Sequence, residues 1–454
     1  MKRGKKLEVI PGLAESWSQV APTVWRFKLR SGVKWHDGSA FTADDVVFSI
    51  KRAQGDTSTF RVYGRQVGEP RKVDASTVEF TTPVPNPVML ETVALLAIMS
   101  KPWCEKHGAL RSQDFGKGED TYASRHAMGT GPYVFVSREP DVRSVFKRNP
   151  AWWGTFEGNV DDIVYTTIKS DATRMAALAA GDLDFVLDPP NQDIEKLSRD
   201  PRIRIYRAPE NLVFFLGMNQ SRAGSPFKDI RVRRALYQAI DTDAINRVVM
   251  RGLAVSTGLV LPNPEAAGVD PKLNTRLPYD VAAAKRLLVE AGYPKGFATE
   301  LDCQSVREIV CTAVAGMLAR VNVAVKVNSL ANARYFAKGQ ALDSMFYLLG
   351  WGGPNNDAMF TLQPLLHGRN ARGDGDYNWG DYRNEKMDAL IDQARVEIDP
   401  GKRKGLIDEA YRMEKEGIHH IPLHRRMAPW ASRANVEVAY RPDSWLEVRW
   451  VTVK

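Results

Sequence analysis

The segment GWGGPNND, residues 350–357, gathers side chains suited to holding a small polar molecule, directly after the apolar run MFYLL. Trp351 offers a flat apolar wall, and Asn355, Asn356 and Asp357 offer hydrogen-bond donors and acceptors. The glycines permit close approach to the backbone. Such a segment either lines a binding pocket, which combines apolar walls with few polar groups, or forms a surface turn whose tryptophan packs into the core.

A phosphate-binding loop is a third use of glycine-rich segments, and this one does not fit it. Phosphate loops open a helix, present backbone N–H groups and are followed by Lys-Ser or Lys-Thr. Pro354 lacks the N–H group, and no lysine follows it. The segment therefore predicts contact with an organic solute rather than with a nucleotide.

Four further side chains are candidates for the same kind of contact, each with a structural alternative. Tyr377 and Trp379, in GDYNWGDYRN, are either pocket walls or core packing. Asn211, in APENLVFF, is a ligand contact or an ordinary turn asparagine. Arg334, in ANARYF, forms a fork for a carboxylate or is an exposed helical arginine.

The segment HHIPLH, residues 419–424, raises the possibility of a metal site. On a strand, His420 and His424 share one face while His419 points away, and no acidic residue is spaced to complete a site. We therefore predict no metal, and keep His424 as a candidate ligand contact. The sequence also lacks GxSxG, HExxH and paired catalytic carboxylates, so we expect neither an enzyme nor a cofactor.

Composition excludes several other classes of protein. The 454 residues carry a net charge of +9, but the basic residues are scattered, which argues against nucleic-acid binding. The longest apolar stretch, PVMLETVALLAIM, is interrupted by Glu91 and is shorter than the roughly 18 residues that span a bilayer. The start, MKRGKKLEVI, lacks the apolar core of a secretory signal.

The three cysteines, Cys104, Cys303 and Cys311, form no CxxC pair. Cys303 and Cys311 are close enough in sequence to form a bridge. A strand-to-helix placement does not obviously bring their Cβ atoms within the ~3.8 Å that a disulfide needs, so we expect three free thiols.

Strand and helix patterns alternate along the chain and predict mixed α/β lobes. TADD places a capping box, Thr42 and Asp45, before an apolar helix face. DIVYTTI, TRMAALAAG and LDFVLDPP resemble a βαβ unit with Gly181 as the helix C-cap. VRRALYQAI has apolar residues at helical spacing, with its arginines expected in water, and DVAAAKRLLVEAG begins at the N-cap Asp280.

Several separated segments match one family in order: PGLAESW (11–17), FKLRSGVKWHDGSAFTADDVVFSIKRA (27–53), GTGPYVF (129–135), RNPAWWG (148–154), FLGMNQ with PFKDIRVRRALYQAIDTDAI (215–245) and YDVAAAKRLLVEAGYPKGF (279–297). The chain resembles the family 5 extracellular solute-binding proteins of ABC importers, the dipeptide and oligopeptide group. The resemblance extends from residue 9 to the C-terminus.

The resemblance implies a type II periplasmic-binding-protein-like bilobed α/β fold with an extra domain inserted in the N-terminal lobe. Residues 1–155 would form the extra domain, residues 156–255 plus 433–454 the first lobe, and residues 256–432 the second lobe. Relatives carry about forty residues before PGLAESW, including a signal sequence and the first strand of the first lobe, so the resemblance leads us to expect that the first strand is missing from the sequence given.

The resemblance also implies a function. The chain would be a periplasmic or extracytoplasmic monomer that captures a peptide, opine, sugar or metal chelate between its lobes and delivers it to a membrane permease and its ATPase. A ligand sensor or chaperone-like binder on the same fold is the alternative.

By the same resemblance, Trp351 and the polar residues after it line the cleft, Tyr377 and Trp379 approach it, and Asn211 and His424 contact ligand. Peptide-binding relatives often carry an aspartate where this chain has Pro354. The usual clamp for an α-ammonium group is therefore in doubt here.

Overall fold

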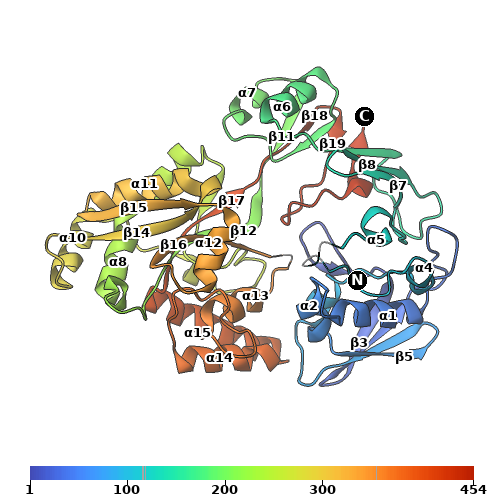
Figure 1. The fold of residues 1–454 in the computed structure, drawn as a ribbon, viewed down its shortest axis with the longest axis horizontal. Coiled ribbons are helices and arrows are strands. Elements are labelled where there is room, and N and C mark those ends of the chain that lie inside the picture. The colour runs from blue at the N-terminus through green and yellow to red at the C-terminus, as the bar shows by residue number, and fades with distance from the viewer. Residues whose placement is uncertain (115–116, 118, 354) are drawn as a thin grey trace. The chain divides into compact units, whose positions relative to one another are not determined.

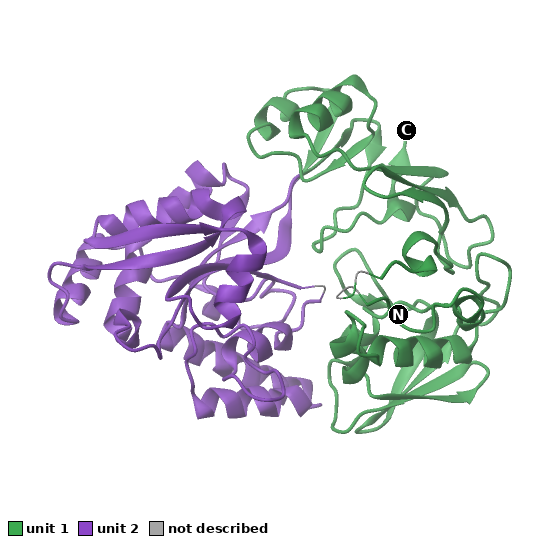
Figure 2. Cartoon of the chain, viewed as in Figure 1, with its two compact units in different colours: residues 1–206, 430–454 green, residues 207–429 purple. Residues whose placement is uncertain are grey.

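The computed structural model describes residues 1–114, 117, 119–353 and 355–454. These residues divide into two compact units, residues 1–206 with 430–454 (unit 1) and residues 207–429 (unit 2) (Figure 2). The division differs from the lobe boundary expected near residue 255. Residues 209–256 belong to unit 2 because their strands pair within its central sheet.

Unit 1 contains a four-stranded antiparallel sheet covered by a helix. Its strand order is β3 (Ala14–Ala21), β4 (Val24–Leu29), β6 (Thr77–Thr81), β5 (Glu69–Asp74). The helix, α1 (Ala43–Gln54), begins at the predicted capping box, where the Asp45 carboxylate accepts a hydrogen bond from the Thr42 N–H group at 2.8 Å. The core between them includes Phe27, Ile50 and Phe80. Short helices and strands complete this part: α2 (Arg61–Gln66), α3 (Met89–Val93), α4 (Lys101–Lys106), α5 (Tyr122–Arg125), β1 (Lys2–Arg3), β2 (Val9–Ile10).

The rest of unit 1 holds two three-stranded sheets, and here the predicted βαβ unit is wrong. The first sheet has the order β7 (Tyr133–Glu139), β8 (Arg143–Arg148), β9 (Asp162–Thr166), and the second has the order β10 (Phe185–Leu187), β18 (Trp430–Arg433), β11 (Ile203–Tyr206). The strands β9 and β10 flank helix α6 (Asp171–Ala180) but belong to different sheets, each pairing antiparallel with another partner. Gly181 ends α6 at φ 93°, as predicted. The remaining elements are α7 (Ile194–Ser198), β19 (Val436–Glu437) and β20 (Thr452–Val453).

Unit 2 is built on a six-stranded mixed sheet (Figure 1). Its order is β13 (Ala254–Ser256), β17 (His420–Met427), β12 (Pro209–Met218), β16 (Phe346–Gly352), β14 (Phe297–Gln304), β15 (Val323–Leu330). Helices cover both faces, so strand β12 is buried on both sides. Successive residues of β12 point into different hydrophobic cores. Phe214 and Leu216 belong to the first core, and Val213 and Phe215 belong to the second.

The first core of unit 2 packs helices α8 (Ile230–Ala239), α10 (Val281–Glu290) and α11 (Glu308–Ala319) on the sheet. Asp280 caps α10 as predicted, accepting a hydrogen bond from the Ala283 N–H group. The predicted apolar face of α8 is buried, but not all its arginines lie in water. Arg233 is 6% exposed, and its guanidinium donates hydrogen bonds to the backbone carbonyls of Phe227, Lys228, Gly417 and Ile418. It therefore supplies hydrogen-bond donors to carbonyl groups inside the unit.

The second core packs helices α12 (Asn332–Gln340), α14 (Glu385–Val396) and α15 (Pro400–Gly417) on the opposite face. Short turns α13 (Met359–Thr361) and η6 (Leu362–Leu366) follow the end of β16. Trp351 and Tyr377 pack against this core, so the second core supports the candidate site.

The expectation of three free thiols is wrong, because Cys303 and Cys311 form a disulfide. Strand β14 ends one residue after Cys303, and a tight turn, η5 (Ser305–Arg307), folds α11 back over the strand end. This reversal brings the two Cα atoms to 6.5 Å, inside the range that a bridge spans. Cys104 is free and buried, and burial raises the pKa of its thiol.

Reduction of the disulfide should lower the free energy of unfolding by about 2–3 kcal/mol, because the bridge closes a short loop in the unfolded chain. Urea unfolding with and without a phosphine reductant measures this change. A Cys303→Ala/Cys311→Ala variant should show no response to the reductant, whereas Cys104→Ala should respond like the unaltered protein. Equal stability of the oxidised and reduced forms would contradict the bridge.

Candidate functional site

The GWGGPNND segment lies where β16 reaches the edge of the unit 2 sheet. The glycines are required by tight packing: a Cβ atom at position 350 would lie 2.6 Å from the Phe214 ring, and one at position 353 would lie 2.3 Å from the Phe360 ring. Both distances are shorter than real Cβ contacts. The glycines therefore hold the strand end against its neighbours and leave Trp351 as the large side chain between them.

Trp351 is half-buried and belongs to an aromatic group. Its ring centroid lies 5.1 Å from that of Tyr377 and 5.5 Å from that of Phe360. The indole N–H group is buried and donates no hydrogen bond to the described residues. Such a ring presents an apolar surface fixed by two aromatic neighbours, together with one unused donor.

Asn211, at the start of β12, holds the loop that follows Trp351. Its side-chain amide donates hydrogen bonds to the Gly353 carbonyl at 2.6 Å and to the Asn355 carbonyl at 2.8 Å. Asn211 is 5% exposed, so in this structure its amide is occupied by the loop. The residue positions the segment that carries Trp351.

Replacement of Asn211 by alanine should lower the free energy of unfolding by about 1–2 kcal/mol, because two partly buried carbonyl groups lose their hydrogen-bond donor. Urea unfolding at pH 7 measures this loss. Asn211→Asp keeps the side-chain size but removes the donor and places a carboxylate against two carbonyls, so it should be at least as destabilising. An aspartate variant as stable as the unaltered protein would contradict this role.

The described polar residues of the segment form hydrogen bonds within the protein. Asp357 accepts two hydrogen bonds from Arg403, at 2.8 and 2.9 Å, and both side chains are largely buried. Asn355 accepts a hydrogen bond from the Asp357 N–H group, and Asn356 accepts one from the Asn263 side chain at 3.3 Å. Pro354, the position compared with the aspartate of peptide-binding relatives, lies outside the described residues.

The two aromatic candidates of the 377–379 loop occupy different environments. Tyr377 is half-buried beside Trp351. Trp379 is fully buried, with ring contacts to Tyr335 and Tyr347 at 5.5 and 5.3 Å. Trp379 therefore anchors the loop in the hydrophobic core, and Tyr377 is the residue of the two whose ring contacts Trp351.

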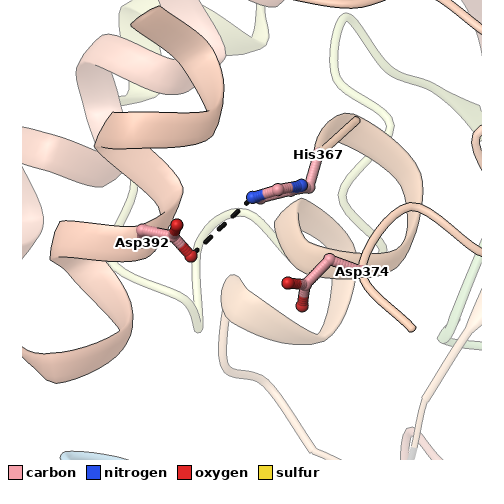
Figure 3. A group of neighbouring side chains, drawn as sticks. All are labelled: His367, Asp374 and Asp392. Atoms are coloured by element: carbon pink, nitrogen blue, oxygen red, sulfur yellow. Dashed lines mark ion pairs between the residues drawn. The ribbon is translucent and has the colours of Figure 1, made fainter. Parts of the chain in front are cut away.

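The same loop is fastened by a buried polar cluster, His367, Asp374 and Asp392 (Figure 3). One nitrogen or oxygen of each lies within 4.8 Å of the others, a spacing compatible with a metal. Positive charge is already present there, because Arg372 and Arg395 pair with both carboxylates. Both Asp374 oxygens are also hydrogen-bonded, to Gln363 and Asn370. The cluster therefore fits an anchor between the loop and α14.

His424 lies inside the sheet layer. It is 1% exposed, its ring lies 5.4 Å from the Phe214 ring, and its Nδ1 atom has no hydrogen-bond partner among the described residues. Its pKa is lowered to about 4, chiefly by burial and to a smaller extent by the charges of Arg307 and Arg276. The ring is therefore neutral at pH 7 and is enclosed by protein in this structure.

Arg334 lies on the outside, in the first turn of α12, directly after β15. It forms no ion pair within the part of the chain that the structure describes. Its guanidinium is therefore available to an anion, as the sequence analysis proposed.

Sequence reasoning missed three residues of the site. Arg403 comes from a helix 46 residues beyond its partner Asp357, and no local pattern indicates that pair. Phe360 and Arg307 follow strand ends, where side chains meet at one sheet edge. Their positions after the carboxyl ends of predicted strands could have indicated both Phe360 and Arg307.

Comparisons with known proteins agree with this architecture. The family model described as bacterial extracellular solute-binding proteins, family 5 Middle, matches residues 8–373. The chain is 29% identical to the dipeptide-binding protein of Escherichia coli K12 over 436 residues, covering 89% of this chain and 78% of that protein. It is 28% identical to heme-binding protein A of Haemophilus influenzae over 468 residues, covering 96% and 80%.

A solved structure, HbpA2 from Haemophilus parasuis, superposes with a TM-score of 0.84 at 25% identity, covering 100% of this chain and 92% of that one. The predicted α/β binding-protein fold is thereby confirmed. No helix among the described residues has the length and apolar character needed to cross a membrane. The chain belongs to the bacterial extracellular solute-binding proteins of family 5.

Proposed function

We propose that the chain captures a small peptide or a related polar solute at the carboxyl edge of the unit 2 sheet, with Trp351 as the apolar wall, and delivers it to an ABC permease driven by its ATPase. Membership of a solute-binding family supports capture without chemical conversion, so the protein is not an enzyme. The observation that carries the site is the half-buried Trp351, which is fixed by aromatic neighbours and by the Asn211-held loop.

The candidate residues take two kinds of role in this proposal. Trp351, Tyr377 and Arg334 would face the solute, because they are half-buried or exposed and their side chains form no hydrogen bond among the described residues. Asn211, Asn355, Asn356, Asp357, Trp379 and His424 would support those residues, because each is buried or engaged in internal contacts. A supporting residue affects binding through the position of the residues that it holds.

An extracytoplasmic location is part of the proposal. The disulfide between Cys303 and Cys311 supports it, since disulfides persist in oxidising compartments and are rare in the cytosol of mesophiles. Likeness to the dipeptide-binding protein of Escherichia coli supports a peptide as the first ligand to test.

A thermal-shift screen of the purified protein against a dipeptide panel, with heme and free amino acids included, tests the function. A solute present at 100 times its Kd adds about 2.7 kcal/mol of stability, which raises the melting temperature measurably. Native mass spectrometry would then identify any solute that copurifies. A panel in which no member shifts the melting temperature, combined with a solute-free mass, would contradict the proposal.

A further inference from the structure

Two adjacent tryptophans of unit 1, Trp152 and Trp153, are surrounded by cationic side chains. Lys2 places its Nζ atom 5.7 Å from the centre of the Trp152 ring and 5.5 Å from that of Trp153. The guanidinium of Arg30 lies 4.9 Å from the centre of the Trp153 ring, and that of Arg449 lies 5.8 Å from the centre of the Trp152 ring. Such contacts stabilise a cation beside a ring but leave its hydrogen-bond donors unused.

Paired backbone segments hold these cations in place. Lys2 lies on β1, which pairs antiparallel with β2. Arg449 lies in the turn η7 (Val448–Trp450), and its carbonyl accepts hydrogen bonds from the N–H groups of Glu157 and Gly158, at 3.1 and 2.9 Å. The two tryptophan rings are themselves in contact, with centroids 5.6 Å apart. The cluster is therefore part of the packed structure of unit 1.

The cluster has hydrogen-bond donors that lack acceptors. The Lys2 ammonium forms neither an ion pair nor a hydrogen bond with the residues that the structure describes. Arg449 is 6% exposed, and its guanidinium donates no hydrogen bond within the described part of the chain. The indole N–H group of Trp152 is buried and also has no acceptor there. Because unused buried donors cost free energy, these groups are suited to a ligand that is rich in acceptor oxygens.

The carboxylates near the cluster are shared with other cations. Glu447 lies 3.4 Å from the Arg449 guanidinium and also pairs with Arg441 at 3.6 Å. Glu157 pairs with Lys5 at 2.7 Å. The positive charge around the two tryptophans is therefore only partly neutralised by the protein.

Lys2 and Arg30 have no carboxylate partner among the described residues. The pKa of Lys2 is lowered, chiefly by burial and then by the positive charge of Arg449, with Arg30 acting in the same direction. Glu447 and Glu157 act in the opposite direction without reversing the shift. An anion bound among these side chains would reduce the repulsion between the cations and supply the acceptors that the donors lack.

We propose that Lys2, Arg30 and Arg449 form an anion site in unit 1 that binds a phosphate group. A phosphate group carries at least three strong acceptor oxygens, so it can accept charge-assisted hydrogen bonds from three cations on separate segments, whereas a carboxylate has two oxygens. The site is distinct from the Trp351 group, which belongs to unit 2. Free phosphate and the headgroup of an anionic phospholipid share this chemistry.

Calorimetric titration of the purified chain with sodium phosphate, in a chloride buffer at pH 7, tests the site. We expect saturable binding of one phosphate per chain. Lys2→Gln and Arg30→Gln should each weaken binding at least tenfold, because each removes one charge-assisted hydrogen bond. Lys2→Arg keeps the charge and should bind phosphate within threefold of the unaltered protein.

Lys169→Gln is the matched control, since it removes an exposed lysine of the same unit and should leave the phosphate affinity unchanged. Circular dichroism and urea unfolding of each variant separate loss of the site from loss of the fold. Arg30→Gln provides a second variant on a different segment if Lys2→Gln is unstable.

Sedimentation with phosphatidylglycerol vesicles distinguishes the two sources of phosphate. Sedimentation of the chain with the vesicles that is lost in Lys2→Gln and kept in Lys169→Gln would identify the lipid headgroup. Binding of sodium phosphate without vesicle binding would identify a soluble phosphate. Both results support the site.

Absence of binding to both sodium phosphate and the vesicles would overturn the inference, and so would binding that is unchanged in folded Lys2→Gln and Arg30→Gln. Neither result bears on solute capture at Trp351, which the thermal-shift screen tests separately.

Discussion

Replacement of Trp351 by alanine is expected to weaken solute binding by about 2–4 kcal/mol, a change in Kd of roughly 30- to 1000-fold, since buried aromatic anchors dominate binding energies. The ring is fixed against Tyr377 and Phe360, so little side-chain freedom is lost when a solute packs on it. Calorimetry with the tightest solute from the screen measures the effect.

Two variants separate loss of this wall from general damage. Trp351→Phe keeps an aromatic face, so it should lose less than half of the binding free energy that Trp351→Ala loses. Trp445→Ala removes an indole that is 72% exposed in unit 1 and should leave the Kd unchanged. Unchanged affinity in Trp351→Ala, with the fold intact by circular dichroism, would remove Trp351 from the site.

Acidification is expected to destabilise the protein through His424. Its folded-state pKa is about 4 against an ordinary value of 6.5, chiefly because burial disfavours the imidazolium. The unfolded chain therefore binds more protons between pH 6.5 and pH 4, and stability falls as the pH is lowered through that window. The loss from this one residue approaches roughly 3 kcal/mol near pH 4.

Urea unfolding of the unaltered protein and of a His424 variant, at pH 7 and at pH 4.5, measures the contribution of His424. All other titrating groups contribute equally to the two proteins, so their effects cancel in the comparison. In His424→Gln, stability should fall by roughly 2–3 kcal/mol less between the two pH values than in the unaltered protein. His126→Gln, which alters an exposed histidine, should follow the unaltered protein. A pH-independent difference between His424→Gln and the unaltered protein would show that His424 does not titrate on unfolding.

Much of the fold could be predicted because its signals are local. The cap at Asp280, the left-handed Gly181 and the buried face of α8 each follow from residues within two helical turns. The order of family motifs predicted the architecture, which the family match and the HbpA2 structure confirm. The spacing of residues therefore predicts the individual helices and strands, and the order of the family motifs predicts how these elements assemble.

The errors occurred where a residue's partner is remote or depends on a turn. The buried position of Arg233 depends on carbonyls at Gly417 and Ile418, more than 180 residues away. The bridge between Cys303 and Cys311 depends on how sharply α11 reverses after β14. The supposed βαβ unit had the right elements, but strand pairing is not encoded in the elements themselves.

The candidate site shows the same division. Its centre, Trp351, was predicted from residue type and position, and the structure adds the Tyr377 and Phe360 contacts. The structure gives internal partners to Asn211 and Asp357, through the Gly353 carbonyl and Arg403. Side chains that look available in sequence are often bonded by the chain itself.

Hydrogen–deuterium exchange with and without a bound solute tests the central claim most directly. If the end of β16 is the solute wall, peptides that cover residues 350–357 and 376–380 should exchange more slowly when the solute is bound, and the same peptides in Trp351→Ala should not. Protection confined to other segments, with these two unchanged at saturating solute, would contradict the account.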